Sequence, residues 1–184
     1  MGLSDGELAF RPMVADDLRL LHEWLQRPHV KRWYRDHGDY DDVVAHYGPA
    51  LDGRDPTDHY IVELDGRPIG MLQTYLVADY SDYAEQIGID DDTTAGVDIL
   101  IGVEQLTGQG LGTEILTRFV HDVVFERPEI VGCVADPDSA NYASLRAFEK
   151  AGFRAARTFR EDPGDGEIHT LVRLDRYGAQ SAPR

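Results

Sequence analysis

Residues 96–120 read GVDILIGVEQLTGQGLGTEILTRFV and change character twice along their length. The run over 96–103 is rich in apolar and β-branched side chains, which predicts a strand. Apolar residues then recur at helical spacing from Leu111 to about Phe125, which predicts a helix. The turn between them holds Gly108, Gly110 and Gly112. The segment therefore predicts a strand, a glycine-rich turn and a helix, in that order.

The chain before this segment predicts strands and helices of ordinary length. The expected elements are a strand over 8–13, a helix over 15–27 stopped by Pro28, a helix around Val43, Val44 and Tyr47 that ends near Gly48-Pro49, and strands over 59–64 and 68–76 joined by a tight Asp65-Gly66 turn. Residues 79–94 form a long polar interruption, which predicts a functional or mobile loop.

The chain after the glycine turn predicts a strand over 130–135, a helix over 141–151 closed by Gly152, and strands over 153–159 and 168–174. This order of elements indicates an α/β protein with a mixed sheet and helices packed on both sides of it. At 184 residues the chain fits one domain. We expect that domain to span 1–177, with a flexible tail over 178–184.

The composition limits the kinds of ligand and partner that we expect the protein to bind. A net charge of -16 disfavours nucleic acid and anionic membranes and favours cationic ligands, although such an excess of carboxylates can also serve solubility alone. One cysteine, Cys133, rules out an intramolecular disulfide, and the seven histidines lack metal-ligand spacing, so we expect no metal. Without an apolar segment of membrane-spanning length or a basic leader, the expected location is the cytoplasm, as a monomer or homodimer.

The glycine turn is a candidate anion site. It comprises Thr107, Gly108, Gln109, Gly110, Leu111, Gly112 and Thr113. The first N–H groups of a helix are unpaired, and glycines remove side chains that would keep an anion away, so a pyrophosphate could bind there. The alternative is that the glycines serve backbone geometry alone. The spacing fits neither a Rossmann fingerprint nor a P-loop.

At this turn the sequence resembles the GCN5-related N-acetyltransferase superfamily, whose acetyl-CoA loop has the form Gln/Arg-x-x-Gly-x-Gly/Ala. Residues 107–112 match in place, with Thr107 departing at the first position, and the helix then starts at Leu111. A second register, Gln105-x-x-Gly108-x-Gly110, restores the glutamine. The resemblance implies a mixed, mostly antiparallel sheet, with acetyl-CoA as co-substrate.

Residues 136–153 carry a second match, similar to the family's Asn-x-x-Ala-x-x-x-Tyr-Glu-Lys-x-Gly-Phe signature. The resemblance implies that Asn141 contacts the pantetheine or a nearby backbone group. Phe148 stands where many members have a tyrosine that can protonate the leaving thiolate. Phenylalanine has no proton to give, so water or another group, with Tyr142 as a candidate, would have to supply it.

The resemblance extends to the aminoglycoside 6'-N-acetyltransferases over nearly the whole chain. The similar features are Glu23-Trp24-Leu25, Trp33-Tyr34, Pro68-Ile69-Gly70-x-x-Gln73-x-Tyr75, Val97-Asp98 and Asp136-Pro137. Siderophore-type acyltransferases share part of the N-terminal half. The family reading implies a small cationic amine as substrate.

Asp98 is the candidate catalytic base or amine anchor, because an amine must lose a proton before it attacks a thioester. A surface aspartate at a strand start is the alternative. The amide N–H groups of Leu100, Ile101 and Gly102 are candidates for polarising the thioester carbonyl. By resemblance, the residues that line the substrate site are Trp33, Tyr34, Gln73, Tyr75, Asp82, Asp98, Asp136 and Asp165. Each of these acids could instead be a solvated loop residue. Trp33 and Tyr34 could belong to the core, and Gln73 and Tyr75 could merely cap the sheet edge.

These observations predict direct acetyl transfer from acetyl-CoA to a primary amine of an aminoglycoside, the 6'-amine by resemblance, in a ternary complex. The alternative enzyme is a siderophore-biosynthetic or other small-amine or protein N-acyltransferase of the same fold. The alternative outside enzymes is a catalytically weak protein that binds acetyl-CoA or the drug, which Phe148 favours.

Overall fold

The computed structural model describes residues 6–35, 38–160 and 166–176. The chain divides into two compact units, unit 1 with residues 1–74 and 98–115, and unit 2 with residues 75–97 and 116–184. Strands β3 (Arg67–Leu76) and β4 (Thr94–Ile101) each contribute residues to both units. The tail predicted over 178–184 lies outside the described residues, and the single-domain boundaries stay a prediction.

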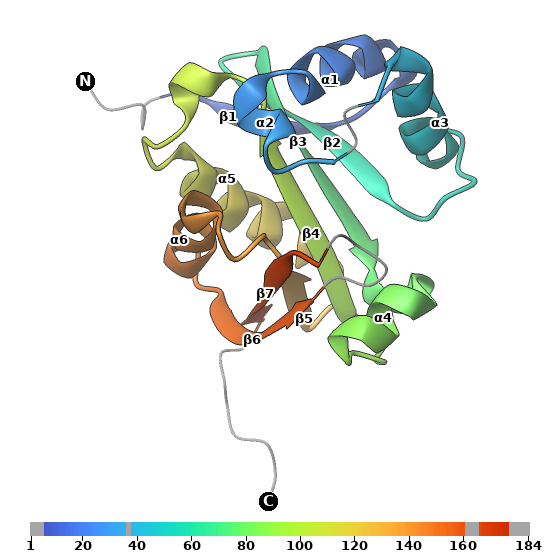
Figure 1. The fold of residues 1–184 in the computed structure, drawn as a ribbon, viewed down its shortest axis with the longest axis vertical. Coiled ribbons are helices and arrows are strands. Elements are labelled where there is room, and N and C mark those ends of the chain that lie inside the picture. The colour runs from blue at the N-terminus through green and yellow to red at the C-terminus, as the bar shows by residue number, and fades with distance from the viewer. Residues whose placement is uncertain (1–5, 36–37, 161–165, 177–184) are drawn as a thin grey trace, which may run out of the picture. The chain divides into compact units, whose positions relative to one another are not determined.

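The described residues form a seven-stranded sheet in the order β1-β2-β3-β4-β5-β7-β6 (Figure 1). The remaining strands are β1 (Leu8–Pro12), β2 (Asp58–Leu64), β5 (Gly132–Ala135), β6 (Arg154–Arg160) and β7 (Ile168–Asp175). β4 and β5 are parallel, whereas β1–β2, β2–β3, β5–β7 and β6–β7 are antiparallel. The prediction of a mixed, mostly antiparallel sheet is confirmed.

The hairpin β2–β3 turns at Asp65 and Gly66, whose φ angles of 51° and 71° suit a two-residue turn. Its register shifts by one residue between Val62 and Glu63: Glu63 pairs with Pro68, but Val62 pairs with Gly70. Ile69 is thus the extra residue of a β-bulge on β3. The bulge decides which side chains of the two strands face each other.

The core of unit 1 packs helices onto strands. Helix α1 (Leu18–Leu25) buries an amphipathic face, and α3 (Tyr40–Leu51) contributes Val43 and Tyr47. These side chains pack with Ile61, Met71 and Leu100 of β2, β3 and β4. Figure 1 shows α1 and α3 in this part of the chain, together with the short helix α2 (Pro28–Lys31).

Pro28 and Pro49 do not end helices in the way that the sequence predicted. The stretch predicted as one helix over 15–27 consists of η2 (Ala15–Asp17), a 3-10 turn, followed by α1, and Pro28 opens a further short helix, α2 (Pro28–Lys31), instead of only ending one. The end predicted near Gly48-Pro49 is wrong, since α3 runs through Pro49 to Leu51. Leu51 packs against the core, and this packing holds the last turn.

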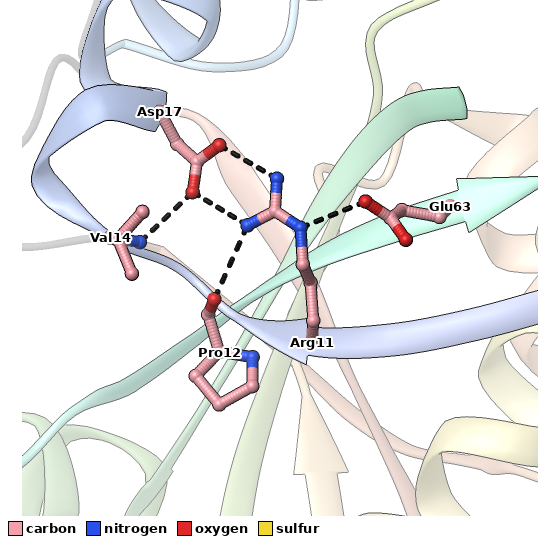
Figure 2. Close-up of polar contacts among 5 residues, drawn as sticks. All are labelled: Arg11, Pro12, Val14, Asp17 and Glu63. Atoms are coloured by element: carbon pink, nitrogen blue, oxygen red, sulfur yellow. Dashed lines mark hydrogen bonds and ion pairs between the residues drawn. The ribbon is translucent and has the colours of Figure 1, made fainter. Parts of the chain in front are cut away.

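One polar cluster ties β1 to η2 and β2 (Figure 2). The Asp17 carboxylate accepts two hydrogen bonds from the Arg11 guanidinium, at 2.7 and 2.8 Å, and one from the Val14 N–H at 2.9 Å. Arg11 also donates to Glu63 at 2.8 Å. The Arg11 hydrogen bonds hold the pKa of Asp17 below its usual value, so the pair stays ionised at neutral pH.

Unit 2 contains a helix where a loop was predicted. Residues 79–94 include all of α4 (Ser81–Ile87), which follows the 3-10 turn η3 (Val77–Asp79). Ala84 and Ile87 pack with Val77, Val134 and Leu171, and this burial stabilises a short helix that is polar elsewhere. The prediction of a long loop is therefore wrong.

The elements after β4 follow the prediction closely. They are η4 (Glu104–Leu106), α5 (Leu111–Phe119), the π-helical continuation η5 (Val120–Val124), β5 and α6 (Tyr142–Lys150). Within the described parts of the chain, no helix is long and apolar enough to cross a lipid bilayer.

Candidate functional site

The glycine turn precedes the first turn of α5. Gly108 and Gly110 have φ angles of 71° and 88°, which residues with a Cβ rarely adopt. A Cβ at either position would meet nothing within 4 Å, so open space lies on that side of the backbone. Gly112 already belongs to α5, which begins at Leu111. This start agrees with the first of the two registers considered for the loop, the one over residues 107–112. The loop can present backbone N–H groups to an anion.

The C-terminal half of β4 extends past its parallel partner. Pairing with β5 ends at Gly96↔Val134, whereas β4 continues to Ile101. His29 donates to the Ile101 carbonyl at 3.0 Å and Arg27 donates to the Gly102 carbonyl at 2.8 Å. These contacts from α2 and the residue before it fix the end of the strand.

The prediction for the Gly102 amide needs a correction. The Gly102 N–H donates to the Ile69 carbonyl at 2.8 Å, and the Val103 N–H donates to the same oxygen at 3.3 Å. A donor that is already bonded is not available to polarise a thioester carbonyl. The roles of Leu100 and Ile101 stay predictions.

Asp98 lies half-buried on β4 and is held by a side chain from β3. Gln73 donates from Nε2 to Asp98 Oδ2 at 2.8 Å. The Gln73 Oε1 lies 3.1 Å from Nε2 of His59, which comes from β2. Three neighbouring strands of unit 1 thus place an imidazole, an amide and a carboxylate in a row. Gln73, predicted to bind a ligand or cap the sheet edge, contacts the candidate base, and its contact with a ligand stays a prediction.

Asp136 of unit 2 is also held by neighbours. Tyr83 donates its hydroxyl to Asp136 Oδ1 at 2.6 Å. His169 Nδ1 lies 2.7 Å from the Asp136 carbonyl oxygen and 3.4 Å from Oδ2. Because α4 supplies Tyr83 and β7 supplies His169, two elements orient this carboxylate.

Tyr75 belongs to a cluster of aromatic rings in the same unit. Its ring meets those of Tyr80 and Tyr83 edge to face, at 5.2 and 6.1 Å between centroids. Gly96 permits this arrangement, because a Cβ there would lie 2.4 Å from the Tyr75 ring. Tyr75 therefore lies against β4, with Tyr83 linking the cluster to Asp136.

The other predicted substrate residues have more ordinary surroundings. Trp33 is half-buried, with the Arg32 guanidinium 4.7 Å from its ring centroid, and Tyr34 packs against the core of unit 1. Asp82 is exposed in the first turn of α4. Asp165 lies outside the described residues.

The signature helix α6 starts at an asparagine cap. Asn141 accepts a hydrogen bond from the Ser144 N–H at 3.1 Å, so its side chain contacts a nearby backbone group. Phe148 is 2% exposed and packs edge to face on Phe153 at 5.0 Å. Tyr142 is 73% exposed. Among the described residues, no three His, Cys, Asp or Glu side chains gather in a group that could hold a metal ion.

Comparison with known proteins defines the class. Residues 13–161 match the model of the Acetyltransferase (GNAT) domain, so the chain belongs to the GNAT family and is an N-acetyltransferase. It is 31% identical to Aminoglycoside N(6')-acetyltransferase type 1 of Klebsiella pneumoniae over 166 residues, which cover 88% of this chain and 81% of the relative. The same identity and coverage hold for the protein of that name from Serratia marcescens.

Solved structures agree with the sequence comparison. The aminoglycoside acetyltransferase AAC(6')-Ib in complex with coenzyme A and kanamycin superposes with a TM-score of 0.83 at 30% identity, covering 93% of this chain and 96% of that one. The prediction of the acetyltransferase fold and the resemblance to the aminoglycoside 6'-N-acetyltransferases are both confirmed.

Three residues of these arrangements were not predicted: His59, Tyr83 and His169. His59 stands in a strand opposite Gln73, but only the bulged register shows this pairing. Tyr83 lies in the segment 79–94, which was predicted to be a loop, so it gave no signal as a site residue. His169 could have been noticed as a polar residue near the start of an expected strand.

Proposed function

We propose that this protein transfers the acetyl group of acetyl-CoA to the 6'-amine of an aminoglycoside by direct transfer in a ternary complex. The observation that carries the proposal is the Asp98 carboxylate, ordered by Gln73 on the part of β4 that extends beyond β5. The relatives that bind coenzyme A and kanamycin support both the donor and the acceptor.

The described residues fit acetyl-CoA. Residues 107–113 offer open backbone and a helix start for the diphosphate, and the end of β4 offers strand backbone to an extended ligand. Acetyl-CoA supplies an acetyl group activated as a thioester. We assign acetyl-CoA binding to the glycine turn, β4 and α6. Asn141 contributes by capping the start of α6.

Asp98 binds the substrate amine and accepts its proton. At neutral pH the substrate amine is an ammonium, which the carboxylate can bind and from which it can take a proton directly or through water. The neutral amine nitrogen then forms the new C–N bond as the C–S bond breaks, and it gives up a second proton to solvent as it becomes an amide. The thiolate takes a proton from solvent. Phe148 has no proton to give and packs on Phe153, so α6 supplies structure at this position and no acid.

The acidic composition suits a substrate with several ammonium groups. In unit 2, Asp136 is oriented by Tyr83 and His169, and Asp82 lies one residue before Tyr83 on α4. Oriented carboxylates bind ammonium groups through charge-assisted hydrogen bonds. We assign these acids, together with Asp165 and the aromatic residues Trp33, Tyr34 and Tyr75, to the aminoglycoside site.

The test is a CoA-release assay over a broad aminoglycoside panel, with the acetylated position mapped by NMR. We expect turnover of substrates that carry a 6'-amine. Turnover of none of them would overturn the aminoglycoside assignment, and better turnover of simple polyamines or hydroxylamines would favour a small-amine acyltransferase instead.

A substitution tests the role of Asp98. Asp98→Asn should lower kcat about 100-fold or more, because it removes the proton acceptor, and should leave the KM for acetyl-CoA nearly unchanged. Asp41→Asn, at an exposed position in the first turn of α3, removes the same charge and should have little effect. Wild-type activity in Asp98→Asn would show that Asp98 is not the base.

A further inference from the structure

We propose that His59 is a positioning residue, which acts through the side-chain amide of Gln73 to fix the orientation of the Asp98 carboxylate. The inference rests on the proposed function, in which Asp98 receives the amine proton. Its basis is the row His59, Gln73, Asp98 across strands β2, β3 and β4 of unit 1.

The β-bulge creates the row. With an unbroken register from the Leu64↔Arg67 pair, His59 would lie opposite Leu72. The extra residue Ile69 shifts the register by one, so that His59 pairs with Gln73. Directly paired side chains lie on one face of a sheet and within reach of each other.

The hydrogen bonds have only one consistent direction. A carboxylate accepts and cannot donate, so the Gln73 group that faces Asp98 at 2.8 Å must be the amide nitrogen. The amide oxygen then faces His59, and because that oxygen only accepts, His59 must donate from Nε2 across 3.1 Å. His59 therefore selects one of the two possible orientations of the Gln73 amide.

The surroundings of His59 favour a neutral imidazole ring with its proton on Nε2. The residue is 9% exposed, and its ring lies edge to face with that of Tyr47 at 5.2 Å between centroids. Its Nδ1 atom is buried and has no hydrogen-bond partner among the described residues. Burial lowers the pKa of His59, with a further lowering by His46, while Gln73, Asp55 and Asp58 oppose this shift. A neutral ring with its proton on Nε2 satisfies all of these contacts.

Removing the Nε2 donor should release the Gln73 amide. The amide can then rotate and direct its oxygen at the Asp98 carboxylate, which repels it and displaces the carboxylate from its position. A misplacement of a catalytic group by about 1 Å can lower a rate roughly 100-fold. The effect should fall on the acetyl-transfer step and on the amine, and acetyl-CoA should bind as before.

The first test compares two substitutions at His59. His59→Phe keeps a ring against Tyr47 but loses the donor, and should lower kcat about 10- to 100-fold while the KM for acetyl-CoA stays within about twofold. His59→Gln loses the ring but places an amide N–H at the same number of bonds from Cβ, and should restore most of kcat. Equal activity of the two variants would overturn the proposal.

His46→Phe is the matched control. His46 is an exposed residue of α3 whose ring also meets that of Tyr47, at 4.7 Å between centroids, and the same substitution there should leave kcat unchanged. If His46→Phe lowers kcat as much as His59→Phe does, the effect comes from packing on Tyr47, and the proposal is wrong.

A double-mutant cycle tests whether His59 acts through Gln73. Gln73→Met keeps the length of the side chain and removes both hydrogen bonds. If the relay is correct, adding His59→Phe to Gln73→Met lowers kcat no further. Fully additive losses would show that His59 acts by another route.

An NMR measurement separates this inference from the proposed function. The imidazole ¹⁵N shifts of His59 in the ligand-free protein at pH 7.5 should show a proton on Nε2 and none on Nδ1. A proton on Nδ1 alone would overturn the relay whatever the enzyme acetylates. Failure of the whole aminoglycoside panel, with the Nε2 proton present, would overturn the substrate and leave the relay standing.

Discussion

Asp17 and Arg11 together link β1, η2 and β2 of unit 1 (Figure 2). Asp17 accepts three hydrogen bonds in a buried position, two of them from Arg11, which also binds Glu63 on β2. A buried acceptor of charged donors is costly to remove. Asp17→Asn should therefore lower the free energy of unfolding by about 1.5–3 kcal/mol, as measured by urea denaturation.

The pH dependence of stability follows from the direction in which folding shifts the pKa of Asp17. The pKa of Asp17 is lower in the folded chain than the ordinary value of 3.8, so its contribution is complete above that value and is lost as pH falls through the folded pKa. Asp17→Asn should flatten this acid dependence. The control is Asp52→Asn, which breaks an exposed 2.9 Å pair with Arg54 and should change stability little. Equal effects of the two substitutions would contradict the account.

Single residues could be nominated from the sequence where their type limits the chemistry. Asp98 was identifiable as a candidate proton acceptor before a strand end, and Phe148 as a residue without a proton to give. The partner of Gln73 was not identifiable, because alternation along β3 gives a side chain its face but not its neighbours. That information came from the register with β2 and the hydrogen bond to Asp98.

At the level of elements, local signals predicted the hairpin and the strand-turn-helix segment well. Asp65-Gly66 fixes the turn, but nothing in the local sequence announces the extra residue Ile69, which moves every later pair by one. Helix α4 was missed for a similar reason. It has seven residues and two buried positions, Ala84 and Ile87, so its stability comes from packing on other elements and its own periodicity is weak.

The glycine turn permits a matched pair of substitutions. Gly108 and Gly53 have φ angles of 71° and 69°, and a Cβ at either would meet nothing within 4 Å. Gly108→Ala and Gly53→Ala should therefore cost similar stability, about 1 kcal/mol or somewhat more, because both strain the backbone. Only Gly108→Ala should raise the KM for acetyl-CoA, since only that loop precedes α5.

The measurement is a pair of thermal melts with steady-state kinetics in acetyl-CoA. A KM that rises equally in both variants would assign the effect to general loss of stability. An unchanged KM in Gly108→Ala would argue against the loop as the diphosphate site.

For the whole molecule, the resemblance of two ordered motifs predicted the family, the fold and the class of reaction, and the comparisons confirm all three. The arrangement of side chains around Asp98 and Asp136 was beyond such motifs. Those contacts join residues between 14 and 53 positions apart in the chain, as for His59 with Gln73 and Tyr83 with Asp136, and only the folded chain brings them together.

The net charge of -16 leads to a prediction at the same scale. A strongly acidic protein attracts a polycation over roughly 30 Å at 10 mM salt but over less than about 10 Å at 300 mM. The kcat/KM for an aminoglycoside with several amines should therefore fall about tenfold over this range. A sugar with a single amine, acetylated by the same enzyme, should show a much weaker dependence, because each charge adds to the attraction. Equal salt dependence of the two substrates would show that the acidic surface has no part in capturing the substrate and serves solubility alone.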